Sequence, residues 1–188
     1  MIVVVSLDTY YTIPSTIPND QLYWDSTTDI TIKADVYITS LAANGDQTYA
    51  IVSPGPTGTR NEYGLGIVGT NKCSGMCSTS TPGAVLFLLA TEGVCFLWIT
   101  TTTTVSLNTW TTIMVKRISG SYSLYINGVS QATISYGSVD SNVIGNAALP
   151  IIVGSNLNGQ LRNLFVNSKL IGKHHHRYYL YHYYYYYY

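Results

Sequence analysis

Few residues of this 188-residue chain are of types that catalyse reactions, and their spacing does not bring them together. Glutamate occurs only at Glu62 and Glu92, whereas a retaining glycosidase needs two carboxyl groups about 5 Å apart. All four histidines lie beyond residue 173, at positions 174–176 and 182. The rest of the chain therefore offers no histidine for a Ser/His/Asp arrangement. We expect no catalytic residues and no enzymatic activity.

Metal binding has equally little support in the sequence. Cys73 and Cys77 are four residues apart, and the chain has three cysteines in all, whereas zinc sites use four ligands and usually a closer pair. A Cys73–Cys77 disulfide and free thiols both remain open. Calcium takes six to eight oxygen ligands, but Asp46, Asp140 and Glu62 are scattered along the chain. We expect no metal or other cofactor, and calcium is conceivable but unsupported.

Aromatic side chains are the residues best suited to binding, because Tyr and Trp combine an apolar ring with a polar group. A sugar site needs such rings at the surface with polar neighbours. Tyr37 falls among the polar positions of its segment, so it is the preferred sugar platform. Tyr49 and Tyr63 are the further candidates. Trp110 begins an apolar segment, and we expect it in the core.

The elements that must position these residues are β-strands. In DITIKADVYIT, which starts at Asp29, apolar residues alternate with polar ones over the whole stretch, as in a strand with one buried face. Similar short segments follow, bounded by Gly, Pro, Asn and Ser, and none has a helical period. Asn127-Gly128 separates YSLYI from VSQATI and predicts a two-residue hairpin turn. We predict an all-β domain with between about ten and fourteen strands.

Composition and charge limit the function classes. Charged residues make up 10% of the chain, well below the average of roughly 25%. Up to Ser168, nine acidic residues stand against six basic ones, which argues against nucleic acid as a partner. No apolar run reaches the ~20 residues of a membrane span. The first residues, MIVVVSLD, lack the basic flank of a signal peptide, so we expect no cleaved leader.

The second half of the chain resembles the concanavalin A-like lectin/glucanase superfamily, in particular its laminin-G-like jelly rolls. Leu124 to Gly128 (LYING) match the family hairpin, Ile152 to Gly154 its penultimate strand, and Gly159 to Val166 its closing strand. The segment DITIKADVYIT matches an early strand, so the resemblance covers roughly residues 20–170. It implies an antiparallel jelly-roll β-sandwich. Glucanases of this family carry E-x-D-x-x-E on one strand, and this chain lacks that pattern.

The C-terminal segment differs from the rest. We predict a jelly-roll domain over residues 1–172 and an extended His/Tyr-rich tail over 173–188. Half of the 18 tyrosines fall in this tail, and so aromatic a segment has high β-propensity and tends to aggregate when exposed. We expect the tail to contact neighbouring subunits; a translated nucleotide repeat and the remnant of an engineered tag are the alternatives. Its contact residues would be Arg177, Tyr178, Tyr179, Tyr181, Tyr183, Tyr184, Tyr185, Tyr186, Tyr187 and Tyr188.

Together these features predict a non-catalytic structural or adhesive subunit of an extracellular or virion assembly, such as a capsid or fibre protein. Its partners would be copies of itself or other structural proteins, with the tail as the contact. The alternative is a carbohydrate-binding, lectin-like module whose partners are glycans. The expected location is a virion or an extracellular surface.

Overall fold

The computed structural model of the chain describes residues 2–5, 11–13, 29–41, 49–54, 63–70, 81–91, 94–135, 151–155, 157–166 and 169–170. Every regular element within these ranges is a β-strand, which confirms the all-β prediction. Nowhere in this part of the chain is there a helix long and apolar enough to cross a membrane.

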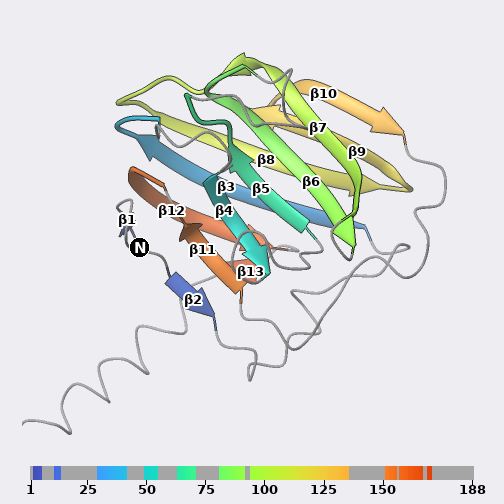
Figure 1. Ribbon diagram of the computed structural model, residues 1–188, viewed down its shortest axis with the longest axis horizontal. Helices are drawn as coiled ribbons and strands as arrows, with labels where there is room; N and C mark the ends of the chain where they lie inside the picture. The colour runs from blue at the N-terminus through green and yellow to red at the C-terminus, as the bar shows by residue number, and fades with distance from the viewer. Residues whose placement is uncertain are drawn as a thin grey trace, which may run out of the picture.

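The strands form two antiparallel sheets (Figure 1). The seven-stranded sheet has the order β1-β12-β3-β8-β9-β10, with β13 paired to β12. Its strands are β1 (Ile2–Val5), β12 (Gly159–Val166), β3 (Ile30–Ile38), β8 (Trp110–Ile118), β9 (Ser121–Ile126), β10 (Val129–Ser135) and β13 (Lys169–Leu170). The six-stranded sheet has the order β2-β11-β4-β5-β6-β7. Its strands are β2 (Tyr11–Ile13), β11 (Ile151–Ser155), β4 (Tyr49–Pro54), β5 (Tyr63–Ile67), β6 (Ala84–Thr91) and β7 (Val94–Thr104).

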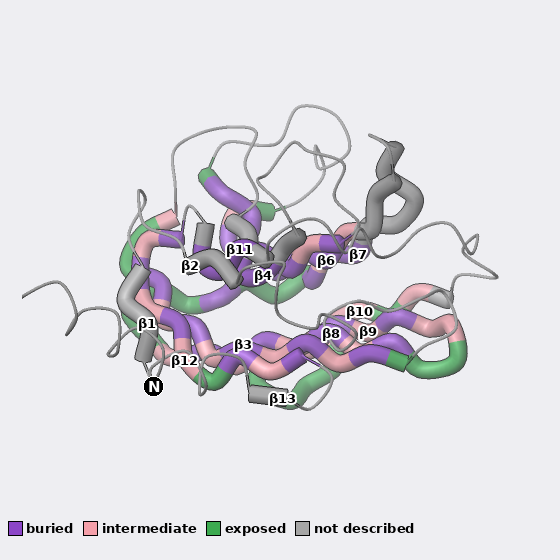
Figure 2. Tube along the Cα trace, turned by 90° about the horizontal axis from the view of Figure 1, so that it is seen from below, coloured by how far each residue is buried: buried purple, intermediate pink, exposed green. Residues whose placement is uncertain are grey.

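The two sheets lie face to face as a sandwich, and the chain passes between them several times (Figures 1 and 2). This arrangement is consistent with the predicted jelly roll. Alternation explains the core, because every second residue of a strand points to the same face. On β3, Ile30, Ile32, Ala34, Val36 and Ile38 are no more than 2% exposed. They pack in one cluster with apolar residues of the opposite sheet, including Ile51, Leu65, Ile67, Val85 and Phe87.

The turn at Asn127-Gly128 has the conformation that the dipeptide predicts. Asn127 has φ 50° and Gly128 has φ 80°, and Ile126 pairs directly with Val129. Asn127 also ties the turn to β8, since its Oδ1 accepts a 2.9 Å hydrogen bond from the Thr112 amide. The hairpin β9–β10 is thereby anchored to the centre of the seven-stranded sheet.

The two sheets differ in how accessible their outer faces are. On β6, Val85 and Phe87 belong to the main core, yet the alternate residues Ala84 and Leu86 are also buried, in a second cluster with Val68. Both faces of this strand are therefore covered. On β3 and β8 the outward residues are instead half-buried or exposed, so the outer face of the seven-stranded sheet is the open one.

Candidate functional site

Side chains on the outer face of the seven-stranded sheet (hereafter the outer face) come from residues that alternate with the core. On β3 these are the odd-numbered residues Thr31, Lys33, Asp35 and Tyr37, all half-buried. On β8 they are the even-numbered residues Trp110, Thr112, Met114 and Lys116. The described part of the outer face thus combines aromatic, cationic and hydroxyl-bearing side chains, whereas the inner face is mostly apolar, with Thr111 and Arg117 of β8 as buried exceptions.

Tyr37 and Trp110 form an aromatic pair on this face. They are directly opposite each other in the β3–β8 register, and their ring centroids lie 5.6 Å apart with an interplanar angle of 52°. The sequence placed Trp110 in the core, and that prediction is wrong. Ile113 and Val115 fill the core from β8, so Trp110, at the opposite parity, shares the outer face with Lys116.

Arg162 reaches this pair from β12, directly before a β-bulge. The β12–β3 register shifts between Arg162 and Phe165, and Asn163 has φ 51°. Arg162 faces outward by its regular alternation with the buried Leu161, and the bulge turns Asn163 to the outer side as well, before the buried Leu164. The Arg162 guanidinium carbon lies 3.9 Å from the centroid of the Trp110 ring, which is a close cation–π contact.

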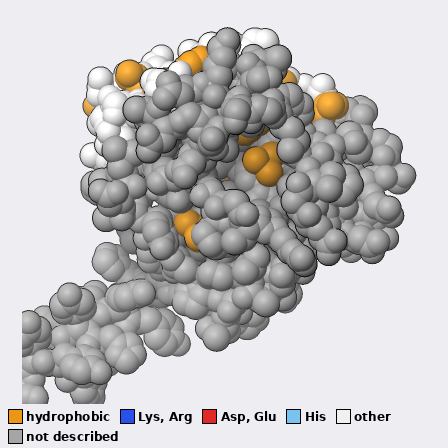
Figure 3. Space-filling view, in the orientation of Figure 1, with side chains coloured by type: hydrophobic (Ala, Val, Ile, Leu, Met, Phe, Trp, Pro, Cys, Tyr) orange, Lys and Arg blue, Asp and Glu red, His pale blue; other side chains and the backbone are white. Residues whose placement is uncertain are grey.

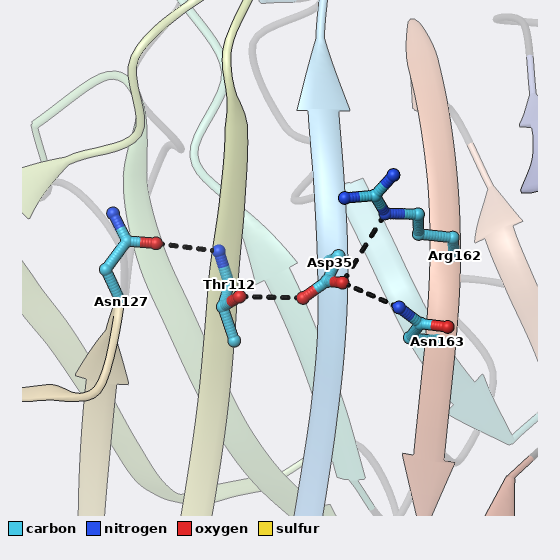
Figure 4. Close-up of polar contacts among 5 residues, drawn as sticks. All are labelled: Asp35, Thr112, Asn127, Arg162 and Asn163. Carbon is cyan, nitrogen blue, oxygen red and sulfur yellow. Dashed lines mark hydrogen bonds and ion pairs between the residues drawn. The ribbon is translucent and has the colours of Figure 1, made fainter.

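Asp35 joins β3 to both neighbouring strands (Figure 4). Its Oδ1 accepts a 2.7 Å hydrogen bond from the Thr112 hydroxyl of β8, and its Oδ2 accepts a 2.8 Å hydrogen bond from the Asn163 amide of β12. The Arg162 Nε lies 3.5 Å from the same Oδ2. This Nε is buried and makes no hydrogen bond, so its link to Asp35 is an ion pair of longer range.

These contacts keep Asp35 ionised. Burial by itself raises the pKa of the Asp35 carboxyl, but the hydrogen bonds from Thr112 and Asn163 and the charges of Arg162 and Lys33 outweigh burial. The net result is a pKa below the ordinary value. A carboxylate of this kind orients its neighbours and is poorly suited to donate a proton in catalysis.

Further hydrogen-bonding groups lie next to the end of β3 that carries Tyr37. The Thr39 hydroxyl donates a 3.1 Å hydrogen bond to the carbonyl of Asn158, and the Asn158 amide donates to the Ser40 hydroxyl. Thr39 and Ser40 are exposed, as is Asn108, which precedes Trp110 by two residues. The aromatic pair therefore has hydrogen-bonding groups on two sides.

The three predicted sugar platforms have different outcomes. Tyr37 lies half-buried on the outer face, as its place among polar residues predicted. Tyr63 is fully buried between the sheets and cannot stack on a sugar there; it shares a face of β5 with the core residues Leu65 and Ile67. Tyr49 begins β4, but its side chain is outside the described residues.

Several other predictions also lie outside the described residues. These are the Cys73–Cys77 alternatives, the scattered carboxylates considered for calcium, and the whole tail with its tyrosines and Arg177. The domain boundary at residue 172 and the intersubunit role of the tail stay predictions. Among the residues that are described, no group of three or more His, Cys, Asp or Glu could hold a metal ion.

The side over the six-stranded sheet shows few described side chains. Figure 3 views the molecule over the six-stranded sheet, and the described side chains visible there are hydrophobic or uncharged. Three described cationic side chains contact aromatic rings, and all belong to the seven-stranded sheet: Arg162 and Lys116 on its outer face, and the buried Arg117 beside Tyr122 on its inner side. The outer face is therefore the better candidate site.

The sequence contains a match to a known family over most of its length. Residues 8–176 match the family model of the concanavalin A-like lectin/glucanases superfamily. The chain belongs to this superfamily. Its membership confirms the resemblance based on the LYING hairpin and the closing strand. A search among curated protein sequences finds no match.

Several solved structures share the fold at low sequence identity. The carbohydrate-binding module CBM40 of the Ruminococcus gnavus IT-sialidase, bound to α2,3-sialyllactose, is 14% identical with a TM-score of 0.57, covering 92% of this chain and 91% of that one. A putative carbohydrate-binding protein from Bacteroides ovatus is 15% identical with a TM-score of 0.59; the match covers 88% of this chain and 43% of that one. A heptameric SAP-like pentraxin from Limulus polyphemus is 15% identical with a TM-score of 0.50, covering 92% and 82%. These similarities establish the fold.

Proposed function

We propose that this superfamily member is a non-catalytic carbohydrate-binding module that holds a sugar on the outer face. The observation that carries the proposal is the Tyr37–Trp110 pair, two half-exposed rings at a centroid distance of 5.6 Å. Sugar rings have apolar C–H faces that pack on aromatic rings, while their hydroxyls need hydrogen-bonding partners nearby. Thr112, Asn163 and Arg162 provide such partners beside the pair.

Arg162 limits how the sugar can lie. Its guanidinium covers one side of the Trp110 ring at 3.9 Å, so a bound sugar would contact the Tyr37 ring and the open part of the indole. Arg162 would then act as a hydrogen-bond donor at the edge of the site, because its side chain is 36% exposed.

The carboxylates in the described part of the chain are not paired, which is consistent with a binding role. The carboxylates whose side chains are described are Asp29, just before β3, and Asp35, near the middle of that strand. Six residues of β-strand separate them by roughly 20 Å, far beyond the distance of about 5–10 Å used by glycosidases. Two structural neighbours are described as carbohydrate-binding, which is consistent with this proposal. An extracellular or virion-surface location, where glycans are met, belongs to the same proposal.

A glycan array followed by calorimetry tests the function. The full-length chain should bind at least one glycan. Tyr37→Ala and Trp110→Ala should each weaken binding at least about tenfold, as expected for aromatic anchors, while Tyr37→Phe keeps the ring and should retain most of the affinity. Thr133→Ala, on the distant strand β10, is the control for effects on the sheet. Full affinity in both ring-removal variants would place the site elsewhere, and the absence of any glycan binding would contradict the function.

A further inference from the structure

Three cationic side chains cross the outer face diagonally. Arg162 on β12 is opposite Asp35, Lys33 on β3 is opposite Met114, and Lys116 on β8 is opposite Thr31. Each cation is therefore one strand over and two residues along from the one before it. Diagonal neighbours on antiparallel strands lie roughly 7–8 Å apart. We call Arg162, Lys33 and Lys116 the cationic stripe; it extends over about 15 Å.

The stripe leaves this face with excess positive charge. Asp35 is the one carboxylate among the described outward side chains of β3, β8, β9 and β12, so three cations face one anion, an excess of two positive charges. Asp29, exposed just before β3, lowers the excess to one if it is included; its Oδ1 accepts a 2.8 Å hydrogen bond from the Ser119 amide. Acidic residues outnumber basic ones up to Ser168, so this face is positive although the domain as a whole has a negative formal charge.

Two cations of the stripe are held against aromatic rings. Besides Arg162 over Trp110, the Lys116 Nζ lies 5.8 Å from the centroid of the Tyr125 ring. Figure 4 shows the contact of Arg162 with Asp35 made through Nε, while the two terminal nitrogens point away from the carboxylate. A planar guanidinium held this way can donate two parallel hydrogen bonds to a carboxylate or sulfate group.

We propose that the ligand of the outer face is an acidic saccharide. Its carboxylate or sulfate groups would lie along the cationic stripe, and a sugar ring would contact Tyr37 and Trp110. This inference rests on the proposed function and adds the chemical class of the ligand. A neutral glycan would gain no attraction from the excess positive charge, whereas an acidic one would. Nucleic acid is disfavoured because its binding proteins neutralise many phosphates, about six to ten in typical cases, whereas the stripe has three cations.

Binding of defined polymers to the full-length chain tests this proposal. Polygalacturonate carries carboxylates, dextran sulfate carries sulfates, and dextran is a neutral polymer; single-stranded DNA controls for binding to any polyanion. We expect at least one acidic polysaccharide to bind more tightly than dextran and DNA, with an affinity that falls as salt rises. Lys33→Gln/Lys116→Gln should weaken that binding about tenfold, because each exposed ion pair that is lost reduces the affinity roughly two- to fivefold. The matched variant Lys33→Arg/Lys116→Arg keeps the charge and should bind like the wild type.

The outcomes separate this inference from the function it rests on. If Lys33→Gln/Lys116→Gln bound the acidic polysaccharide as tightly as the wild type, the cationic stripe would not be the binding site. The tail is the same in both proteins, so any difference between them comes from the stripe. Binding only to neutral glycans, lost in Trp110→Ala, would overturn the acidic ligand and leave the carbohydrate-binding function intact. Tighter binding to DNA than to either acidic polysaccharide would also contradict the proposal. If no saccharide binds in these assays or on the array, both proposals fail.

Discussion

Asp35 accepts hydrogen bonds from strands on both of its sides, through Thr112 on β8 and Asn163 on β12. With Arg162 as its ion-pair partner, it links three neighbouring strands at one point of the outer face. Its carboxylate is charged at neutral pH, like that of an ordinary aspartate, and it holds Arg162 near the Trp110 ring. We therefore regard Asp35 as a positioning residue for the proposed sugar site.

The lowered pKa of Asp35 predicts a pH dependence of stability. A carboxyl with a depressed pKa in the folded state contributes stability above its unfolded pKa, and this contribution is lost as pH falls through the folded pKa. The free energy of unfolding should thus decrease below about pH 5 in the wild type. Asp35→Asn should lose about 1–2 kcal/mol at neutral pH and show a smaller decrease in acid. Urea unfolding followed by circular dichroism over a pH series measures both.

Thr112→Val is the graded control for this prediction. It removes one hydrogen-bond donor to Asp35 at nearly the same volume, so it should reduce the acid-dependent part of the stability without abolishing it. If the free energy of unfolding fell equally for Asp35→Asn and the wild type throughout the acid range, protonation of Asp35 would not be a cause of the fall.

The contact between Arg162 and Trp110 should be measurable as a coupling energy. In a double-mutant cycle with Arg162→Met and Trp110→Ala, we expect the two changes to be non-additive by about 0.5–1 kcal/mol. Chemical denaturation of the four proteins gives this number. Additive effects, within about 0.3 kcal/mol, would mean that the guanidinium gains nothing from the ring.

Strand β12 has two backbone features that set the geometry of the site. The bulge at Asn163 presents two successive polar side chains to Asp35. At the other end, Gly159 packs so closely on β3 that a Cβ would overlap the carbonyl oxygen of Tyr37. Together they fix how β12 lies along β3, and with it the position of Arg162 relative to Tyr37.

Gly159→Ala and Gly128→Ala make a matched pair of variants. Both glycines have positive φ, but a Cβ at Gly128 would meet no atom within 4 Å. Gly128→Ala should therefore cost only the backbone strain, about 1 kcal/mol. Gly159→Ala must in addition push β12 away from β3, and we expect a loss of about 3 kcal/mol or more. Thermal unfolding compares the two, and equal losses would contradict the close approach.

The two sheets of the molecule differ in how far their outer faces are open to solvent. The six-stranded sheet has a strand, β6, that is buried on both faces, whereas the seven-stranded sheet keeps one face open to solvent. The open face carries the aromatic pair and the cationic stripe. A ligand would therefore contact a rigid sheet whose strands are paired on both sides, with little backbone to order on binding.

The tail provides a prediction about the molecule as a whole. The described strands end at β13, at Leu170, so deletion of residues 173–188 should leave the circular dichroism and the glycan affinity unchanged. If the tail contacts neighbouring subunits, as we predict from its tyrosines, the truncated protein should form fewer oligomers in light scattering. Identical oligomeric states for both proteins would contradict that role, and an unfolded truncated protein would move the domain boundary.

The sequence by itself determined those features that depend on local patterns. The alternation from Ile30 to Ile38 predicted both the strand and the side of it that is buried. Asn127-Gly128 predicted a turn, because both residues adopt positive φ. The same alternation placed Tyr37 on the polar side. The missed position of Trp110 was also readable, since Ile113 and Val115 set the parity of β8.

Only the tertiary structure decided what meets across the strands. The sheet packed over β5 buries Tyr63, although its parity with Leu65 and Ile67 was already readable in the sequence. Asp35 and Asn163 are 128 positions apart in the sequence; the β3–β12 register and the bulge bring them together. Alternation fixes the direction of each side chain within one strand. Register, bulges and sheet packing depend on contacts between distant segments, so the composition of the site could not be predicted from local sequence.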